Sequence, residues 1–555
     1  MKKNKFTFLA GGQAGQGVKK AGAVASLLFR KLGRKVFELE DYQSLIRGGH
    51  NFAAVSSSTG EISSHYMKAD LVVAFDERSY KTHKGHLSKD GLIIYDDSVE
   101  KPENGIAIPL LEKAKDYSRA NLRLGVGSIA VLCAYCGLGK EFLDEIIEEG
   151  YGVDLDNNKE YAHTIYDIAE EKIEEKIELE NGEHDLPIID GNKAIALGAK
   201  AAGLDSYFAY PMSPASPILH FLAKNKDEMA VSVVHAESEL AVINMAIGSS
   251  FTGARTLVGT SGGGFALMAE GYSFAGIAEA PVLVAMASRP GPATGVPTYT
   301  AQGDLKFVLD QGHGEFTNIV ASPGTIEEAF YLASEMMQLI WEFQMPGILL
   351  SEKHLAESSM SVSLDSKKTG WAEPSADKES SDEDYQRYSD TEDGISPLRF
   401  PPSKSFIRWN SYTHDKDGIT TEDAETITWN ANKLNRKTNA LIKKLKSKKT
   451  VNVYGDSGPI IFTYGSVTMS VLEALRCGNL EATIVQPIYL DPLPIWELEK
   501  YRDKDVLFIE QSSTGLFEQL LKEKAGIKAR DSIRKYDGRP FDPEELAAKI
   551  QEVIK

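Results

Sequence analysis

Cysteine is scarce in this chain. There are three cysteines in 555 residues. Cys133 and Cys136 lie together as CAYC in an apolar segment that reads as a helix, whereas Cys477 stands alone. A four-cysteine zinc or iron–sulfur site cannot be built from this set within one chain. We therefore expect buried thiols that pack as small apolar side chains.

Long apolar runs and an excess of positive charge are also missing. No apolar run is long enough to cross a bilayer as a helix, and the one after the basic start MKKNK is too short for a signal peptide. The formal net charge is −19, which argues against nucleic acid as a main partner. We therefore expect a cytoplasmic protein that binds neither membranes nor nucleic acid.

The length and composition indicate several globular domains. Hydrophobic residues make up 42% and charged residues 25%, as in ordinary soluble proteins, and 555 residues are too many for one core. Strand-like and helix-like runs alternate in three stretches, which predicts an α/β fold class with three domains of mainly parallel sheets. The predicted divisions are residues 1–185, 186–360, a polar interdomain segment at 361–450, and 451–555.

A glycine loop opens the first stretch. The strand KFTFLAGG leads into GGQAGQG and then into the predicted helix VKKAGAVASLLFRKLG. Glu38, Glu40 and Asp41 follow at about the distance expected of a dinucleotide site, but the spacing is GxxGxG rather than GxGxxG. A plain strand-to-helix turn is the favoured interpretation, and NAD binding stays open as an alternative.

Polar or glycine-rich residues follow four predicted strands of the second stretch. Ser213 follows the first strand, Glu239 the second, TSGGGF (Thr260–Phe265) the third and Arg289 the fourth. Ligands of open α/β sheets bind at the carboxyl ends of the strands. We therefore expect these four positions to border one crevice.

The loop YPMSPASP, Tyr210–Pro217, carries two Ser–Pro pairs, and both read as helix starts. Free N–H groups and a hydroxyl there suit a carboxylate, although a well-capped helix explains the same pattern. Arg289 favours a carboxylate or phosphate, which a guanidinium grips bidentately. Glu237 and Glu239 could serve only the helix dipole, but small apolar residues after Glu239 indicate close packing there.

Four motifs together resemble the α subunit of 2-oxoacid:ferredoxin oxidoreductases: YPMSPASP, HAESELAVINMAIGSS, TSGGGFALMAEG and RPGPATGVPTYTAQGDL. KYDGRPF and EQSSTG, near the C-terminus, are similar to the same family. GGQAGQGV and RGGHNF resemble its γ subunit fused in front, as is typical of the 2-oxoglutarate type. The resemblance implies a γ-type domain, a thiamine-diphosphate pyrimidine-type domain and a transketolase C-terminal-like domain.

The resemblance also implies a reaction. Enzymes of this family use thiamine diphosphate to decarboxylate a 2-oxoacid, pass electrons to ferredoxin and transfer the acyl group to coenzyme A. Glu239 would be catalytic, through the aminopyrimidine ring. Ser213, Arg289 and Thr298 would bind the substrate. Thr260, Ser261, Gly262 and Gly263 would bind the cofactor, and Gly12, Gly15, Gly17 and Arg47 would contact coenzyme A or a nucleotide.

Absent motifs imply a partner. Thiamine enzymes normally bind the diphosphate through Mg²⁺ at a GDG motif; the nearest match here is YGDSG at Tyr454–Gly458. The resemblance therefore places Mg²⁺ and a 4Fe–4S cluster in a separate β subunit, which shares the thiamine diphosphate, and no metal in this chain. An (αβ)₂ hetero-oligomer is expected.

Three departures from the family pattern leave the substrate open: Ser213 for Thr, Met212 for Ile and Gly263 where Pro is more common. Of the possible substrates, 2-oxoglutarate is favoured, with pyruvate or a branched-chain 2-oxoacid as alternatives. A non-catalytic ligand-binding subunit is the alternative from another functional class.

Overall fold

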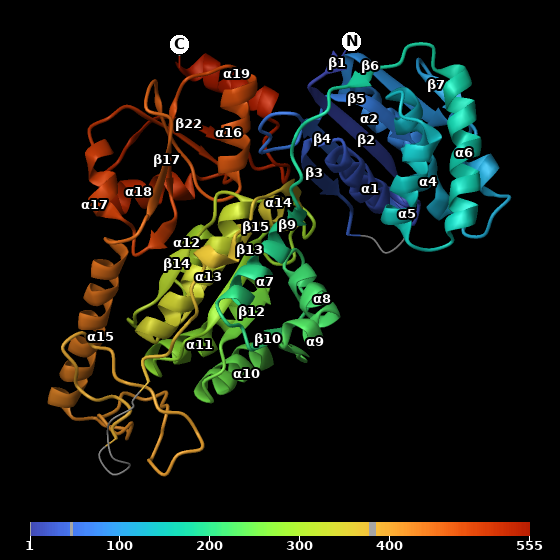
Figure 1. The fold of residues 1–555 in the computed structure, drawn as a ribbon. Coiled ribbons are helices and arrows are strands. Elements are labelled where there is room, and N and C mark those ends of the chain that lie inside the picture. The colour runs from blue at the N-terminus through green and yellow to red at the C-terminus, as the bar shows by residue number, and fades with distance from the viewer. Residues whose placement is uncertain (1, 45–47, 101, 377–384, 555) are drawn as a thin grey trace.

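A computed structural model describes residues 2–44, 48–100, 102–376 and 385–554. Three sheets, each covered by helices, lie in chain order, and both chain ends lie on the same side of the molecule (Figure 1). We call them the N-terminal, middle and C-terminal sheets. The predicted α/β class with mainly parallel sheets is confirmed.

The N-terminal sheet has eight strands in the order β7-β6-β5-β2-β4-β3-β16-β9. Its strands are β2 Lys5–Ala14, β3 Lys35–Asp41, β4 Gly48–Ser58, β5 Ala69–Ala74, β6 Leu87–Asp96, β7 Ile106–Ile108, β9 Ile188–Asp190 and β16 Ser359–Ser361. The accompanying helices are α1 Val18–Lys31, α2 Glu77–His83, η1 Lys84–His86, α3 Leu110–Ala114, α4 Ala120–Tyr135, α5 Lys140–Tyr151 and α6 Leu155–Lys172. A separate pair joins β1 Lys2–Lys3 to β8 Glu178–Leu179.

One prediction for this stretch is wrong. A parallel sheet was expected, yet β4 lies between β2 and β3 and is antiparallel to both. The connection from β3 to β4 spans only residues 42–47. So short a connection permits an antiparallel pair, whereas a parallel pair needs a crossover of about a dozen residues or more.

The middle sheet has seven strands in the order β11-β10-β12-β13-β15-β14-β20, and all pairs except β14–β20 are parallel. Its strands are β10 Ser206–Ala209, β11 Ser232–His235, β12 Thr256–Thr260, β13 Leu283–Ser288, β14 Ile319–Ala321, β15 Gly347–Glu352 and β20 Tyr489–Asp491. Its helices are α7 Gly191–Ala201, α8 Ser216–Lys224, α9 Lys226–Met229, α10 Glu239–Phe251, α11 Gly262–Ile277, α12 Leu305–Leu309, α13 Ile326–Phe343 and α14 Lys353–Glu357.

The C-terminal sheet has five strands in the order β17-β19-β18-β21-β22. Its strands are β17 Val451–Tyr454, β18 Ile460–Phe462, β19 Thr483–Pro487, β21 Val506–Glu510 and β22 Ala529–Arg534. Its helices are α16 Val467–Cys477, α17 Ile495–Leu498, η3 Glu499–Tyr501, α18 Leu516–Ala525 and α19 Pro543–Ile554.

Strands cross the predicted domain divisions. β9 and β16, from the second stretch, pair with each other, and β16 extends the N-terminal sheet through β3. β20, from the last stretch, extends the middle sheet. The three parts also share apolar clusters; Phe37 and Tyr489, for example, belong to the core that covers the middle sheet. The parts are therefore packed into one body.

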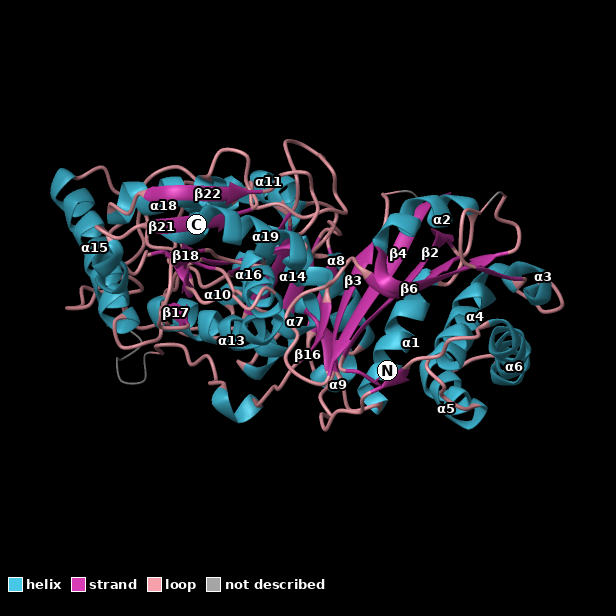
Figure 2. Cartoon of the chain, turned by 90° about the horizontal axis from the view of Figure 1, so that it is seen from above, coloured by secondary structure: helices cyan, strands magenta, loops and turns pink. Residues whose placement is uncertain are grey.

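The polar interdomain segment contains the short turn η2 Ser366–Lys368 and a long helix, α15 Ala424–Leu445. Figure 2 shows α15 at one end of the molecule and α6 at the other. The helix is anchored by two buried lysines, Lys433 and Lys437, which pair with Glu279. The polar composition of this segment therefore did not indicate that it contains a helix that packs against the middle part.

Two local predictions have different outcomes. Cys133 and Cys136 are free and buried at the end of α4, as expected, and burial raises the pKa of both thiols. In contrast, neither Ser213 nor Ser216 is the N-cap of a helix, so the expectation that both Ser–Pro pairs start helices with a serine cap is wrong. The N-cap of α8 is Ala215, because Met212 O accepts from Ala215 N and Ser216 N and forms a turn before the helix. Ser213 thus lies in that turn rather than at a helix start.

Candidate active site

The four predicted positions meet at one edge of the middle sheet. β11, β10, β12 and β13 are neighbours and run parallel, so their carboxyl ends share that edge. Ser213, Glu239, Thr260 and Arg289 each lie at or after one of these ends. These four positions therefore border the edge of the sheet at which ligands of such folds bind.

Glu239 is a buried carboxylate at the first position of α10. Its side chain is 4% exposed, and Ser238 caps the helix by accepting from Ala241 N. A Cβ on Gly264 would lie 2.8 Å from Glu239 Oε1 and closer still to Thr260 Oγ1. Gly264 must therefore stay without a side chain to leave room for this carboxylate.

The three glycines of TSGGGF have three different surroundings. Gly264 packs against Glu239, and a Cβ on Gly262 would lie 2.7 Å from Asp304 Oδ2. In front of Gly263 the nearest atom, Ala293 O, is 4.0 Å away. The middle glycine therefore presents bare backbone to open space, which lets a flat ligand approach closely.

Arg289 is tied to the Ser213 loop. Its Nη1 donates to Ser213 O at 2.7 Å, and Asn192 Nδ2 donates to Pro214 O at 3.0 Å. The backbone, rather than the hydroxyl, of Ser213 makes the contact with the guanidinium. Arg289 also lines a cavity of 320 Å³, which we call the clamp cavity. Apart from Arg289 and Asp304, only Gly, Ala and Pro residues line it.

Asp304 is a site residue that sequence reasoning missed. Its Oδ2 accepts from Ser288 Oγ at 2.7 Å, and the carboxylate borders the clamp cavity beside Arg289. Burial raises the pKa of Asp304, while Ser288 and Arg289 oppose that rise. Burial lowers the pKa of Arg289, and Asp304 opposes it. Asp304 is part of the motif TAQGDL, but no residue near it in the sequence indicated that it lines the same cavity as Arg289.

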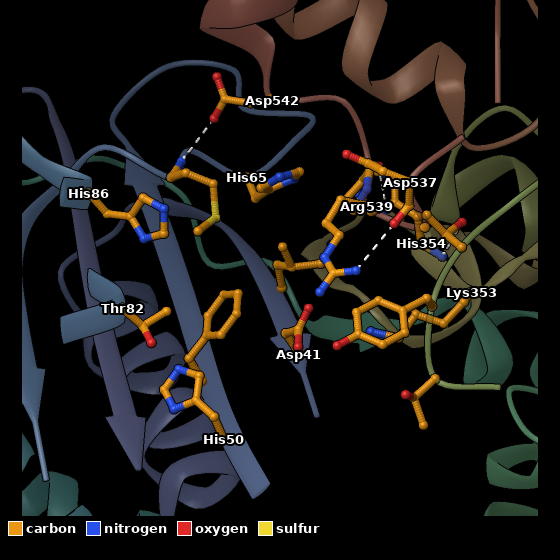
Figure 3. A pocket seen from close by; sticks show the side chains of 18 of the residues that line it. Asp41, His50, His65, Thr82, His86, Lys353, His354, Asp537, Arg539 and Asp542 are labelled. Atoms are coloured by element: carbon orange, nitrogen blue, oxygen red, sulfur yellow. Dashed lines mark hydrogen bonds between the residues drawn. The ribbon is translucent and has the colours of Figure 1, made fainter. Parts of the chain in front are cut away.

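Thr298 lies at a different cavity. This second cavity has a volume of 470 Å³, is lined by residues from all three parts of the chain, and is called the junction cavity here (Figure 3). Thr298 is 4% exposed, and its hydroxyl has no hydrogen-bond partner. His354, 1% exposed, leaves Nε2 equally unpartnered on the same wall. Two buried polar atoms on the lining of this cavity are therefore available to a ligand or to water.

A row of histidines forms another wall of the junction cavity. His50 Nε2 lies 2.7 Å from His83 Nε2, and His83 Nδ1 lies 3.0 Å from His86 Nδ1. Burial lowers the pKa of all three imidazoles, so they are neutral near pH 7. Basic and acidic side chains, including Lys353, Arg539 and Asp41, complete a cavity of mixed charge.

The four residues predicted to contact coenzyme A or a nucleotide are placed as follows. A Cβ on Gly12 would lie 2.7 Å from Phe75, and one on Gly17 would lie 3.3 Å from Gly125, so close packing requires both glycines. Gly15 has no atom within 4 Å of its Cβ position and faces open space. Arg47 lies outside the described residues.

The acidic residues after the glycine loop do not form a dinucleotide site. Glu38 is 3% exposed, accepts from Ser26 Oγ on α1 at 2.8 Å, and has its pKa raised to about 8 by burial. Glu40 pairs with Lys19 at 2.7 Å. Glu38 is therefore turned into the core rather than toward a ribose, which argues against NAD binding here.

Two adjacent helices expose an almost uncharged face. α10 packs against α11, and after Glu239 the only charged residue on either helix is Glu270. Leu240, Met245 and Leu267 are 54%, 45% and 52% exposed. We call this surface, formed by the exposed residues of α10 and α11, the α10–α11 face. Both helices begin at the crevice, so the face and the site are continuous.

Metal-binding clusters and membrane-spanning helices are absent from the described residues. Among these residues, no group of three or more His, Cys, Asp or Glu is arranged to hold a metal ion. Within the same part of the chain, no helix combines the length and apolarity that crossing a membrane requires.

Two known families match two separate parts of this chain. The family described as "Pyruvate flavodoxin/ferredoxin oxidoreductase, thiamine diP-bdg" matches residues 197–433, which include Glu239, TSGGGF and Arg289. The family described as "Pyruvate ferredoxin/flavodoxin oxidoreductase" matches residues 7–168, which include the glycine loop.

A relative decides the assignment. The 2-oxoacid:ferredoxin oxidoreductase subunit alpha of Sulfolobus sp is 30% identical over 623 aligned positions, which cover 99% of this chain and 97% of the relative. The chain belongs to the 2-oxoacid:ferredoxin oxidoreductases, as an α subunit. The predicted family is confirmed, and with it the enzyme class: oxidoreductases that act on an oxo group with an iron–sulfur protein as acceptor.

Two further proteins are similar to this 2-oxoacid:ferredoxin oxidoreductase subunit. The 2-oxoglutarate synthase subunit KorA of Archaeoglobus fulgidus is 29% identical and covers 61% of the chain and 90% of its own length. A solved 2-oxoglutarate:ferredoxin oxidoreductase from Magnetococcus marinus, with 2-oxoglutarate, coenzyme A and succinyl-CoA bound, has a TM-score of 0.90 over 100% of both chains. At 23% identity that structure shows the shared fold.

Proposed function

We propose that this chain is a fused γ–α subunit that, with a β subunit, oxidatively decarboxylates a 2-oxoacid to acyl-CoA and CO₂ and reduces ferredoxin. Glu239 carries the proposal: a buried carboxylate that opens a helix at the crevice and faces a glycine loop. Among the described residues, no lysine or arginine forms an ion pair with it. A buried carboxylate without a cation is costly and is typical of a functional group.

The residues at the crevice fit thiamine diphosphate. Ser261 Oγ is buried without a partner, and Gly263 leaves open space before bare backbone. When bound, thiamine diphosphate supplies a carbon nucleophile for the 2-oxo carbon. Glu239 would hold a proton at a nitrogen of the aminopyrimidine ring. Thr260, Ser261, Gly262 and Gly263 would form the surface under that ring.

Arg289 is the proposed binding group for the substrate carboxylate. It is held by Ser213 O, lines the clamp cavity, and offers further N–H groups to a ligand. Ser213 is proposed to complete this clamp with its hydroxyl. We favour 2-oxoglutarate as substrate, on the basis of the KorA relative and the Magnetococcus neighbour; pyruvate and branched-chain 2-oxoacids are the alternatives.

Coenzyme A is proposed to enter the junction cavity. The unpartnered Thr298 hydroxyl and His354 Nε2 are suited to the amides of its pantetheine arm. A Cβ on Gly11 would lie 3.0 Å from His83, so the end of β2 packs against the histidine wall of this cavity. Gly12, Gly15, Gly17 and Arg47 stay predictions as contacts.

A β subunit is proposed to cover the α10–α11 face. That face is continuous with the crevice, and the chain has no GDG motif for the diphosphate. The β subunit would therefore bring the Mg²⁺ site, the 4Fe–4S cluster and the ferredoxin contact. An (αβ)₂ assembly in the cytoplasm is our proposal for the whole enzyme.

An anaerobic purification tests this proposal. The tagged chain, isolated from its host, should recover a brown partner and reduce a low-potential dye with 2-oxoglutarate, pyruvate or 2-oxoisovalerate in a manner that depends on coenzyme A. Met245→Glu, on the α10–α11 face, should reduce recovery of the partner. The matched control is Val153→Glu, because Val153 is 68% exposed on the N-terminal part. A chain recovered alone, without activity on any of the three acids, contradicts the proposal.

A further inference from the structure

Asp304 lines the clamp cavity together with Arg289. It lies directly before α12, and Ser288 Oγ, at the end of β13, donates to its Oδ2 at 2.7 Å. A Cβ on Gly262 would come within 2.7 and 2.8 Å of its two oxygens. One hydroxyl and one bare glycine therefore hold the carboxylate at the wall of the clamp cavity.

Among the described residues, some N–H groups of the Arg289 guanidinium have no hydrogen-bond partner. Among the described residues, the hydrogen bond to Ser213 O is the one that the Arg289 guanidinium makes. Burial lowers the pKa of Arg289, and the charge of Asp304, on the wall of the same cavity, opposes that lowering. The remaining lining residues of the clamp cavity are uncharged, so this chain offers one cation and one anion to whatever binds there.

We infer that Asp304 is a positioning residue that competes with the substrate carboxylate for Arg289 and thereby weakens the binding of 2-oxoacids. The inference rests on the proposed function, because it takes Arg289 as the group that binds the substrate carboxylate. A second carboxylate brought to the same guanidinium faces a like charge, and like charges a few ångströms apart in a protein repel strongly.

Protonation should remove the competition. The groups that face Asp304 are Ser288 and Arg289 from β13 and the turn after it, and Tyr464, which feels its charge from the C-terminal part. Burial raises the pKa of Asp304, whereas Ser288 and Arg289 lower it. Below that pKa the side chain is neutral, so 2-oxoacids should bind more tightly at acid pH and more weakly as Asp304 ionises.

The test is Asp304→Asn in the complex with the β subunit. Asparagine keeps the shape and can still accept from Ser288, but it carries no charge. Equilibrium dialysis of pyruvate and 2-oxoglutarate against the complex freed of thiamine diphosphate should give Kd values about three- to tenfold lower than in the wild type. The fall in affinity with rising pH should disappear. The matched control, Asp310→Asn, removes an exposed charge after the same helix and should change neither quantity.

A second measurement separates this inference from the proposed function. Phenylglyoxal modifies the deprotonated guanidine, so loss of Asp304 should speed the modification of Arg289, followed by mass spectrometry, without any substrate. Unchanged or higher Kd values, or an unchanged modification rate, overturn the role of Asp304. If the wild-type complex neither binds nor oxidises a 2-oxoacid while the modification rate of the variant still rises, the proposed function fails and the effect of the Asp304 charge on Arg289 stands.

Discussion

Two buried glutamates of the middle part, Glu239 and Glu279, have opposite surroundings. They are 4% and 1% exposed. Glu279 follows α11 and accepts from Lys433 Nζ at 2.6 Å and from Lys437 Nζ; Arg387 Nη2 donates to its backbone oxygen at 3.1 Å. Glu239 opens α10 and, among the described residues, pairs with no lysine or arginine.

The difference separates a structural charge from a functional one. A buried carboxylate is tolerated when cations compensate for lost hydration, and the cations around Glu279 hold the pKa of that carboxyl far below its usual range. Glu239 has no such compensation, yet its position is kept open by Gly264. Space beside a buried carboxylate that has no cation is typical of a ligand-binding position, whereas full compensation by cations indicates a fixed joint between α15 and the middle sheet.

Replacing Glu239 should affect activity most. Glu239→Gln keeps the size of the side chain but removes the carboxylate that, in the proposed function, would hold a proton at the aminopyrimidine ring. We expect 2-oxoacid-dependent dye reduction to fall about 100- to 1,000-fold, with little change in the thermal unfolding midpoint. Glu237→Gln, at an exposed neighbouring position, is the control and should keep full activity. Equal rates in the two variants would refute the catalytic role.

Replacing Glu279 should affect stability instead. Glu279→Gln leaves Lys433, Lys437 and Arg387 buried without their anion, which is expected to cost about 3–5 kcal/mol of unfolding free energy. Calorimetry should show a lower unfolding midpoint, while the activity per folded molecule is retained.

The control for this variant is Glu342→Gln. It breaks the half-exposed ion pair between Glu342 and Lys444, and Lys444 lies on α15, as Lys433 and Lys437 do. A surface pair of this kind contributes about 1 kcal/mol or less. Equal midpoints for the two variants would show that the Glu279 cluster does not anchor α15.

The smallest expected effect is a pH dependence of stability. Three cations surround one carboxylate, and burial lowers the pKa of Lys437 to about 7, opposed chiefly by Glu279. The unfolded chain, with an ordinary lysine pKa of about 10.4, binds a proton that the folded chain has released. Between these two values, stability therefore rises with pH, by up to about 1.4 kcal/mol per pH unit for one proton.

In Lys437→Met this contribution should vanish. The unfolding midpoints of the wild type and the variant, measured from pH 7 to 9.5, should diverge as the pH rises, with the wild type gaining relative to the variant. Parallel curves would mean that Lys437 stays protonated in the folded protein, so that Glu279 compensates both lysines.

The sequence predicted the candidate site unevenly. Ser213, Glu239, Thr260 and Arg289 were found because each follows a strand of a parallel sheet, and such ends meet whatever the loops do. Asp304 was missed because its meaning depends on Arg289 and Gly262, which reach it only through folding. Thr298, expected in the substrate pocket, lines the junction cavity instead, since the loop from Arg289 to Asp304 borders both cavities.

The sequence by itself determined the α/β class and the family motifs. These depend on local periodicity and on residues close together in the chain. Tertiary structure alone decided that β4 separates β3 from β2, that β20 joins the middle sheet, and that two lysines of α15 neutralise Glu279. The physical reason is distance along the chain: strand pairing and buried charge compensation depend on which remote segments pack together, and no local pattern records that choice.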